Sequence, residues 1–169
     1  MKKVLFATLF LMGLSAVVGM KVQAQTKIGY ISMDELVAVM PEAKKADTTL
    51  EKYKEDLGKE GQNIQAEFQQ HYADFNKDSA TMSQAKKDME RRNLQELYAK
   101  VNSYQQDAQQ QFSLKQQEVY GPIQKKAIEA IQEVAKANGY AYVIAKENLI
   151  VSPPADDLLP LVKKQLGIK

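Results

Sequence analysis

The sequence lacks the residues from which most reactive and metal sites are built. It has no cysteine and only one histidine, His71, in 169 residues. Disulfide bonds, thiolate chemistry and cysteine-based zinc sites are therefore excluded. Glu67 and Asp74 lie one turn to either side of His71, so a weak surface metal site is the alternative to the solvated histidine that we favour. The sequence predicts no catalytic, cofactor-binding or metal site.

A phosphate-binding loop is also missing. Gly58 and Gly61 lie inside a helical pattern, whereas a phosphate loop places its glycines directly after a strand. Asp34-Glu35 and Asp156-Asp157 are acidic pairs at predicted helix starts, where they interact favourably with the helix dipole. Catalysis is not needed to explain them, and we expect the protein not to be an enzyme.

Residues 1–24 have the pattern of an export signal. Lys2 and Lys3 precede an apolar run from Val4 to Met20, and Val22-Gln23-Ala24 supplies small or apolar residues before a cleavage site. An uncleaved anchor is the alternative, because about 17 apolar residues can just span a bilayer. We expect cleavage after Ala24 and release of residues 25–169 into the periplasm, with no lipid attachment because no cysteine follows.

The charge of the exported chain is close to zero. The full sequence has 23 Lys and Arg against 21 Asp and Glu, and three of the 23 (Lys2, Lys3 and Lys21) leave with the signal, so 20 remain. A neutral chain lacks the excess positive charge that drives non-specific binding to nucleic acids. We expect no nucleic-acid partner.

Three short strands are predicted near the two ends of the exported chain. They are residues 27–31, 140–145 and 149–151, and residues 146–148 form a tight hairpin connection between the last two. Strands of this length make only a marginal sheet. Other parts of the protein must therefore cover it.

A long helix is predicted after the first strand. Ser32, followed three residues later by Glu35, fits a capping box at the start of a short helix that ends before Pro41. The next helix is predicted from Glu42 to Phe75, with apolar residues at steps of three, four and seven. This stripe consists of Leu50, Tyr53, Leu57, Ile64, Phe68, Tyr72 and Phe75.

The chain is predicted to turn at residues 76–82 and to return in a second helix. Thr81 and Gln84 form a candidate capping box for it, and Asn138-Gly139 is a common helix stop. Its apolar stripe consists of Met82, Met89, Leu97, Val101, Tyr104, Ala108, Phe112, Val119, Ile123, Ala127, Ile131 and Val134.

Antiparallel pairing of the two helices around residue 80 places Pro41 near Gly121-Pro122. We therefore expect both helices to break at one level, which is the root of a protruding arm about 60 Å long. Gly58 and Gly61 indicate either an arm that can bend or tolerated glycines without a role.

The predicted fold is mainly α-helical, with a small β body and a long antiparallel helical hairpin. The body comprises residues 25–41 and 122–169 of a single domain, including a final helix at about 155–166, and the arm comprises residues 42–121. Neither part buries enough apolar surface by itself. We expect copies to share one core and to pair their sheet edges, which predicts an obligate oligomer.

The order of these elements resembles the OmpH/Skp family of periplasmic chaperones over essentially the whole exported chain. The resemblance is carried by residues 27–31, the helix start Met33-Asp34-Glu35-Leu36, the charged hairpin, residues 140–144 and the terminal segment 157–166. It implies a homotrimer with a small β-barrel body and three arms around a cavity. In that cavity such proteins hold unfolded outer-membrane β-barrel proteins without ATP.

One segment departs from the family pattern. Some members carry arginine clusters on the lower return helix that are linked to lipopolysaccharide, whereas residues 105–117 are rich in glutamine and contain Lys115 as the only cation. We therefore transfer no lipopolysaccharide or membrane site. The cations near the tip are interleaved with acids, which favours a solvated face with local ion pairs; these cations are Lys86, Lys87, Arg91 and Arg92.

Candidate client-binding residues cluster on the outer half of the arm. Methionine and aromatic side chains adapt to varied apolar surfaces, and this part of the arm has five in its stripes: Phe68, Tyr72, Phe75, Met82 and Met89. Packing between the two helices is the simpler explanation for these five. Leu94 and Tyr98 lie beside the stripe and are the better candidates for facing a cavity.

Two functions remain open on the sequence. The first is a holdase that encloses unfolded envelope proteins. The second is a structural or adaptor coiled coil whose tip docks on one folded partner. The tip segment 76–79 is small and polar, which favours the holdase.

Overall fold

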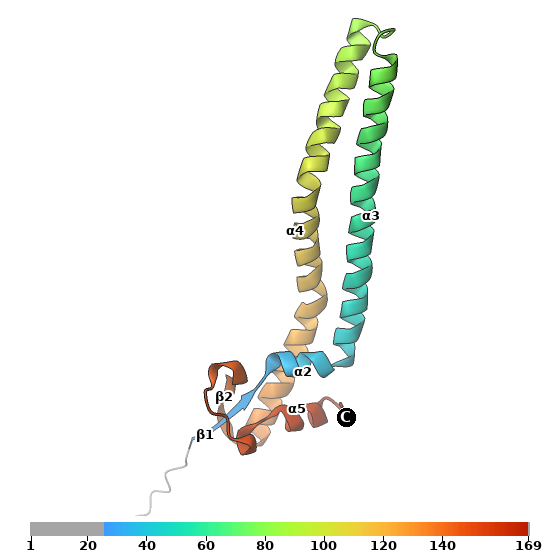
Figure 1. Ribbon diagram of the computed structural model, residues 1–169. Coiled ribbons are helices and arrows are strands. Elements are labelled where there is room, and N and C mark those ends of the chain that lie inside the picture. Colours follow the sequence, from blue (N-terminus) through green and yellow to red (C-terminus); the bar gives the residue numbers. More distant parts are fainter. Residues whose placement is uncertain (1–25, 169) are drawn as a thin grey trace, which may run out of the picture.

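The computed structural model describes residues 26–168, so the predicted export signal lies outside the described part of the chain. Helices α3 (Pro41–Asp78) and α4 (Gln84–Ala137) lie side by side and form a long arm (Figure 1). The other elements gather at the base of the arm, around the C-terminal part of α4. None of the helices formed by residues 26–168 is long and apolar enough to cross a membrane.

The body contains a small parallel sheet. Strands β1 (Lys27–Ile31) and β2 (Tyr140–Ala145) pair in parallel, with Ile28 opposite Tyr142 and Ile31 opposite Ala145. Parallel pairing is possible because the whole arm connects the two strands. These two predicted strands are confirmed. On the other side of β1, Tyr30 forms an isolated bridge with Asp157.

The predicted third strand and its hairpin are wrong. Residues 146–148 form a 3-10 turn, η2 (Lys146–Asn148), and residues 149–151 are irregular. The turn is held from outside: Lys146 Nζ lies 2.7 Å from Glu35 Oε1, and the Ser32 hydroxyl donates a 2.5 Å hydrogen bond to Glu147. These contacts direct the chain toward the start of α2, so it does not reverse onto β2.

The helix after β1 starts as predicted. Ser32 is the N-cap of α2 (Met33–Val39), and its side chain accepts a hydrogen bond from the Glu35 amide. The Glu35 carboxylate does not complete the reciprocal half of the box, because it pairs with Lys146. Helix α2 ends before Pro41, which is the first residue of α3.

The turn at the tip is shorter than expected. Helix α3 continues to Asp78, and α4 begins after Ser83, whose hydroxyl accepts from the Lys86 amide at 3.3 Å. Thr81 is not the cap; its hydroxyl donates to the Asp78 carbonyl at 2.9 Å and stabilises the turn. The predicted capping box at Thr81 is therefore wrong by two residues.

The predicted break in the return helix is also wrong. Helix α4 is continuous over 54 residues and contains Pro122. Gly121 and Pro122 are exposed, so the carbonyl that loses its helical partner at Pro122 can bond to water. The helix ends at Asn138 as predicted, followed by Gly139 with φ 71°, a conformation that favours glycine.

The final helix is shorter than predicted. Residues 154–156 form the 3-10 turn η3 (Pro154–Asp156), and α5 extends only from Leu159 to Gln165. Between them Leu158 donates its amide to the Tyr30 carbonyl at 2.9 Å. Pairing with β1 thus keeps residues 157–158 out of the helix.

The core of the body surrounds the last four turns of α4. Leu36, Met40, Leu158 and Val162 are the largest side chains with no exposed surface. They come from α2, its C-cap, the segment after η3 and α5. Strand β1 also supplies buried residues, whereas β2 and the turns η2 and η3 supply none. The α4 and α3 members of the same cluster are Ile123, Ala127, Ala130, Ile131 and Val134, with Ala43 and Ala46.

Candidate functional site

The arm is held together by one apolar seam. Leu50, Leu57 and Ile64 on α3 are buried, whereas the facing side chains of α4 are only partly buried. A two-helix arm has no third layer to cover its flanks. Both sides of the seam therefore remain accessible along the arm.

The side chain of Tyr104 joins the two helices in the middle of the arm. The Tyr104 hydroxyl donates to the Leu57 carbonyl at 2.6 Å, and a Cβ at Gly61 would lie 2.8 Å from the Tyr104 ring. Gly61 thus makes room for the ring, while Gly58 has no neighbour within 4 Å of such a Cβ. Burial of the hydroxyl, together with the nearby Glu60 carboxylate, raises the pKa of Tyr104. Sequence pattern alone does not distinguish the two glycines.

Two polar contacts join the helices near the root. Lys126 forms an ion pair with Glu42, and the Tyr120 hydroxyl donates to Asp47. The Lys126 hydrogen bond lowers the pKa of Glu42, and the bond to Asp47 raises the pKa of Tyr120. Because Glu42 faces Lys126, Pro41 at the start of α3 lies beside a part of α4 about one turn after Gly121. The predicted position, directly opposite Gly121-Pro122, is therefore shifted.

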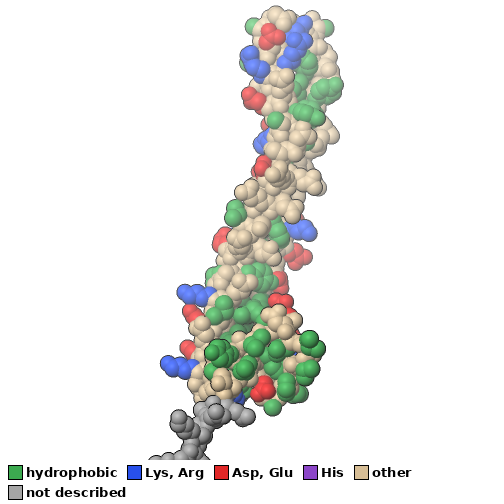
Figure 2. All heavy atoms as spheres, turned by 90° about the vertical axis from the view of Figure 1, so that its left-hand side faces the viewer, with side chains coloured by type: hydrophobic (Ala, Val, Ile, Leu, Met, Phe, Trp, Pro, Cys, Tyr) green, Lys and Arg blue, Asp and Glu red, His purple; other side chains and the backbone are tan. Residues whose placement is uncertain are grey.

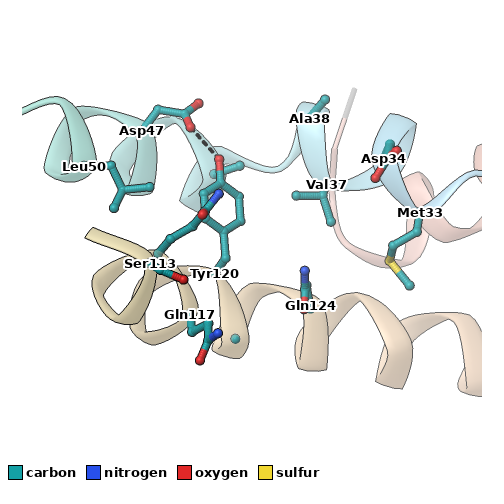
Figure 3. A pocket seen from close by; sticks show the side chains of 13 residues that line it. Met33, Asp34, Val37, Ala38, Asp47, Leu50, Ser113, Gln117, Tyr120 and Gln124 are labelled. Carbon is teal, nitrogen blue, oxygen red and sulfur yellow. Dashed lines mark hydrogen bonds between the residues drawn. The ribbon is translucent and has the colours of Figure 1, made fainter. Parts of the chain in front are cut away.

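A cavity of about 740 Å³ opens at the root. Figure 3 shows it between α2 and α3 on one side and α4 on the other, with the hydrogen bond from Tyr120 to Asp47 joining the two sides. The apolar part of its lining consists of Met33, Val37, Ala38, Ala43 and Leu50. Its polar lining consists of Asp34, Asp47, Ser113, Gln116, Gln117, Tyr120 and Gln124, with Gly121 beside them.

The predicted client-binding residues form an aromatic cluster in the outer half of the arm. The rings of Phe68 and Tyr72 stack with centroids 6.1 Å apart, and Phe68 also contacts Tyr98 on the other helix at 5.9 Å. Phe68 is partly buried, while Tyr72 and Tyr98 are 53% and 58% exposed. The structure thus brings these three together, with one ring in the seam and two beside it.

The other candidates are spread toward the tip. Phe75 and Leu94 are partly buried, and Met89 is 46% exposed. Met82 is partly buried in the turn and precedes α4, so it does not belong to the return helix. The seven predicted client-binding residues differ in exposure. Among them only Tyr72, Tyr98 and Met89 have large exposed apolar side chains.

The cations near the tip and His71 lie on the surface of the arm. Arg91 lies 3.6 Å from Asp88 within the tip cluster, an ion pair between helical neighbours. His71 is exposed, and in the described part of the chain no three His, Asp or Glu residues are grouped to hold a metal ion.

The body exposes a second apolar surface. Figure 2 shows hydrophobic side chains gathered over the base of the molecule and in smaller groups along the arm. A groove of about 570 Å³ lies between β2 and α4. Its apolar lining includes Ile31, Met33, Ile128, Ile131, Tyr140, Tyr142, Val143 and Ile144. Among the described residues, β2 pairs only with β1, so its other edge is free.

The segment after η2 is the most exposed apolar part of the described chain. Ile150 and Val151 are 103% and 77% exposed, and the backbone at Leu149 is extended. The sequence prediction recognised its strand-forming residues, but it placed the partner strand in the same chain.

Comparison with known proteins agrees with this architecture. No curated protein matches the sequence. The chain is similar to the crystal structure of an OmpH-like protein from Caulobacter crescentus CB15 named as an outer membrane chaperone, with a TM-score of 0.67, 18% sequence identity and 88% coverage of both chains. The family model "Outer membrane protein (OmpH-like)" matches residues 27–166. The chain therefore belongs to the OmpH-like family.

Proposed function

We propose that this protein is an ATP-independent periplasmic holdase that encloses unfolded outer-membrane β-barrel proteins between the arms of an oligomer. The observation that carries this proposal is the arm itself. Helix α3 has 38 residues, which is about 57 Å at helical rise. The outer half of the arm exposes the aromatic side chains Tyr72 and Tyr98.

The outer aromatic cluster supports weak contacts with many chains. Tyr72 and Tyr98 expose about half of their surface, and their rings offer apolar faces with a polar tip. Such side chains can contact different sequences without fixing a register. An adaptor that docks on one folded protein would need a specific patch at the tip, and the tip turn is polar.

The oligomer is supported by two complementary features of the body. One is the free edge of β2 with the apolar groove beside α4, and the other is segment 149–151, in which Ile150 and Val151 are exposed. We propose that this segment of one copy pairs with the β2 edge of the next. A contact of this kind between different surfaces forms a ring when the rotation from one copy to the next closes, and family resemblance favours three copies.

Charge placed on the segment tests this arrangement. The variant Ile150→Asp/Val151→Asp should sediment as a monomer at micromolar concentration, since two carboxylates would be buried against the groove. Val39→Asp is the matched control, because Val39 is also exposed but lies on α2. A variant that keeps the mass of the wild type would contradict the pairing, and a folded wild-type monomer at nanomolar concentration would contradict the obligate oligomer.

The holdase function is tested by diluting a urea-unfolded β-barrel protein into buffer with and without the purified protein. We expect suppressed light scattering and a discrete soluble complex, both without ATP. No suppression, together with a stable complex with one folded envelope protein, would support the adaptor function instead.

The double substitution Leu94→Gln/Tyr98→Gln tests whether these two side chains contribute to client binding. Client retention should fall while the helical signal and oligomer mass stay unchanged. Val39→Gln serves as the control for polar replacement of an exposed apolar residue outside the arm. Loss of the oligomer in the Leu94/Tyr98 variant would show that these side chains are structural.

A further inference from the structure

A second hollow continues the root cavity up the arm. It has a volume of about 710 Å³ and is lined by Asn102, Gln105, Gln106, Gln109, Gln110, Ser113 and Leu114, all on α4. Ser113 also lines the root cavity, so the two hollows meet there. The α4 side chains that line either hollow are named here the amide track.

The amide track is long and uncharged. It extends from Asn102 to Gln124, which is about 33 Å at helical rise. Its amide side chains are Asn102, Gln105, Gln106, Gln109, Gln110, Gln116, Gln117 and Gln124, and its other members, Ser113, Leu114, Tyr120 and Gly121, are also uncharged. Lys115 on the same helix is paired with Glu118 at 2.8 Å and lines neither hollow.

The amide groups of the track take no part in side-chain hydrogen bonds within the described chain. All eight are exposed. Within residues 26–168 none of them forms a side-chain hydrogen bond with another described residue, whereas Gln111, which lies outside the track, accepts one from the Tyr53 hydroxyl. The donors and acceptors of the track are therefore available to a ligand.

We propose that the amide track binds the main chain of an extended, unfolded polypeptide. A carboxamide carries the same donor and acceptor groups as a peptide bond, so it can pair with N–H or C=O groups whatever the client's sequence or direction. The apolar wall of the root cavity, formed by Met33, Val37 and Leu50, accepts one apolar side chain at the end of the track. This inference rests on the proposed holdase function and names the surface that performs it.

The geometry of the track explains a loose hold. Successive turns of α4 present amides about 5.4 Å apart, whereas the groups on one side of an extended chain recur at about 6.7 Å. Only some contacts form at a time, so no register is favoured and the client can slide. The lining of the upper hollow carries no charge, so binding there should depend little on salt.

Removal of three amides tests the inference. In the full-length exported protein, Gln106→Ala/Gln109→Ala/Gln110→Ala should raise the Kd for a fluorescently labelled, urea-unfolded β-barrel protein about tenfold, because each hydrogen bond is worth roughly a factor of two to ten. The control Gln62→Ala/Gln65→Ala/Gln69→Ala removes three exposed glutamines of α3 and should leave the Kd within about twofold. Alanine favours helix in both variants.

A peptide competitor separates main-chain from side-chain binding. An unstructured ten-residue peptide of alternating valine and serine should displace the client from the wild type, and the same peptide with alternate N-methylated amides should not. A photo-crosslinker at Gln109 should capture the client, whereas one at Glu129, which is exposed on α4 outside the track and the aromatic cluster, should not.

The outcomes are distinct. Equal Kd values for track and control variants, equal competition by the two peptides, or a Gln109 crosslink to a second copy of this chain would overturn the amide track while the holdase function stands. A wild type that binds no unfolded client would overturn both.

Discussion

Gly58 and Gly61 provide a matched pair of substitutions that tests how the arm is packed. Both glycines lie in the interior of α3, three residues apart, and both should gain about 0.8–1 kcal/mol of helix stability on replacement by alanine. At Gly58 nothing lies within 4 Å of the new methyl group. We expect Gly58→Ala to stabilise the arm by about this amount.

At Gly61 the same change meets the Tyr104 ring. The new Cβ would lie 2.8 Å from one ring carbon and 3.1 Å from the next, and the ring is fixed by the hydrogen bond to the Leu57 carbonyl. Overpacking of this kind costs about 1–3 kcal/mol, which cancels or exceeds the helix gain. We expect Gly61→Ala to be about 1–3 kcal/mol less stable than Gly58→Ala.

Urea unfolding followed by circular dichroism at 222 nm measures the difference, at one protein concentration because the oligomer links stability to concentration. In the background Tyr104→Ala the clash is removed, so both substitutions should stabilise equally. If Gly61→Ala stabilises the wild type as much as Gly58→Ala does, the Tyr104 ring is not held against α3 and the reasoning fails.

Two further substitutions test the body. Leu158→Ala, at a side chain with no exposed surface, should cost about 2–5 kcal/mol of unfolding free energy, whereas Val39→Ala, at an exposed side chain, should change it by less than about 0.5 kcal/mol; similar urea midpoints for the two would contradict the assigned core. Ser32→Ala should cost about 1 kcal/mol through loss of the α2 cap. The Ser32 hydrogen bond also lowers the pKa of Glu147 below 4.5, so its contribution is present above pH 4.5 and is lost as the pH falls through the folded pKa. The stability difference between wild type and Ser32→Ala should therefore shrink in acid, and a constant difference from pH 7 to pH 3 would argue against this bond.

Local signals in the sequence predicted most of the secondary structure. The strands at 27–31 and 140–145 and the cap at Ser32 depend on neighbouring residues, and they are confirmed. The stripe of α3 follows helical periodicity, so its buried members could also be recognised. The amide track is visible in the sequence as a glutamine-rich segment, but its spatial continuity with α2 and α3 is not.

The errors arose where distant residues compete with local preference. Residues 149–151 have strand-forming side chains, yet Glu35 and Ser32 hold the preceding turn, and these residues pair with no strand of the described chain. Pro122 normally interrupts a helix, but here it lies on an exposed face where water can replace the lost partner. Which local preference prevails depends on contacts that sequence spacing does not reveal.

By itself, the sequence determined that two long helices pair through one apolar stripe each and that short strands lie at the ends of the exported chain, because periodicity and caps act over a few residues. Only the tertiary structure decided that the strands pair in parallel and that the Tyr104 ring packs against Gly61. It also decided that, within residues 26–168, the second edge of β2 and the exposed segment 149–151 have no strand partner. Those features depend on contacts between residues 40 or more positions apart, whose meeting is set by the packing of whole elements.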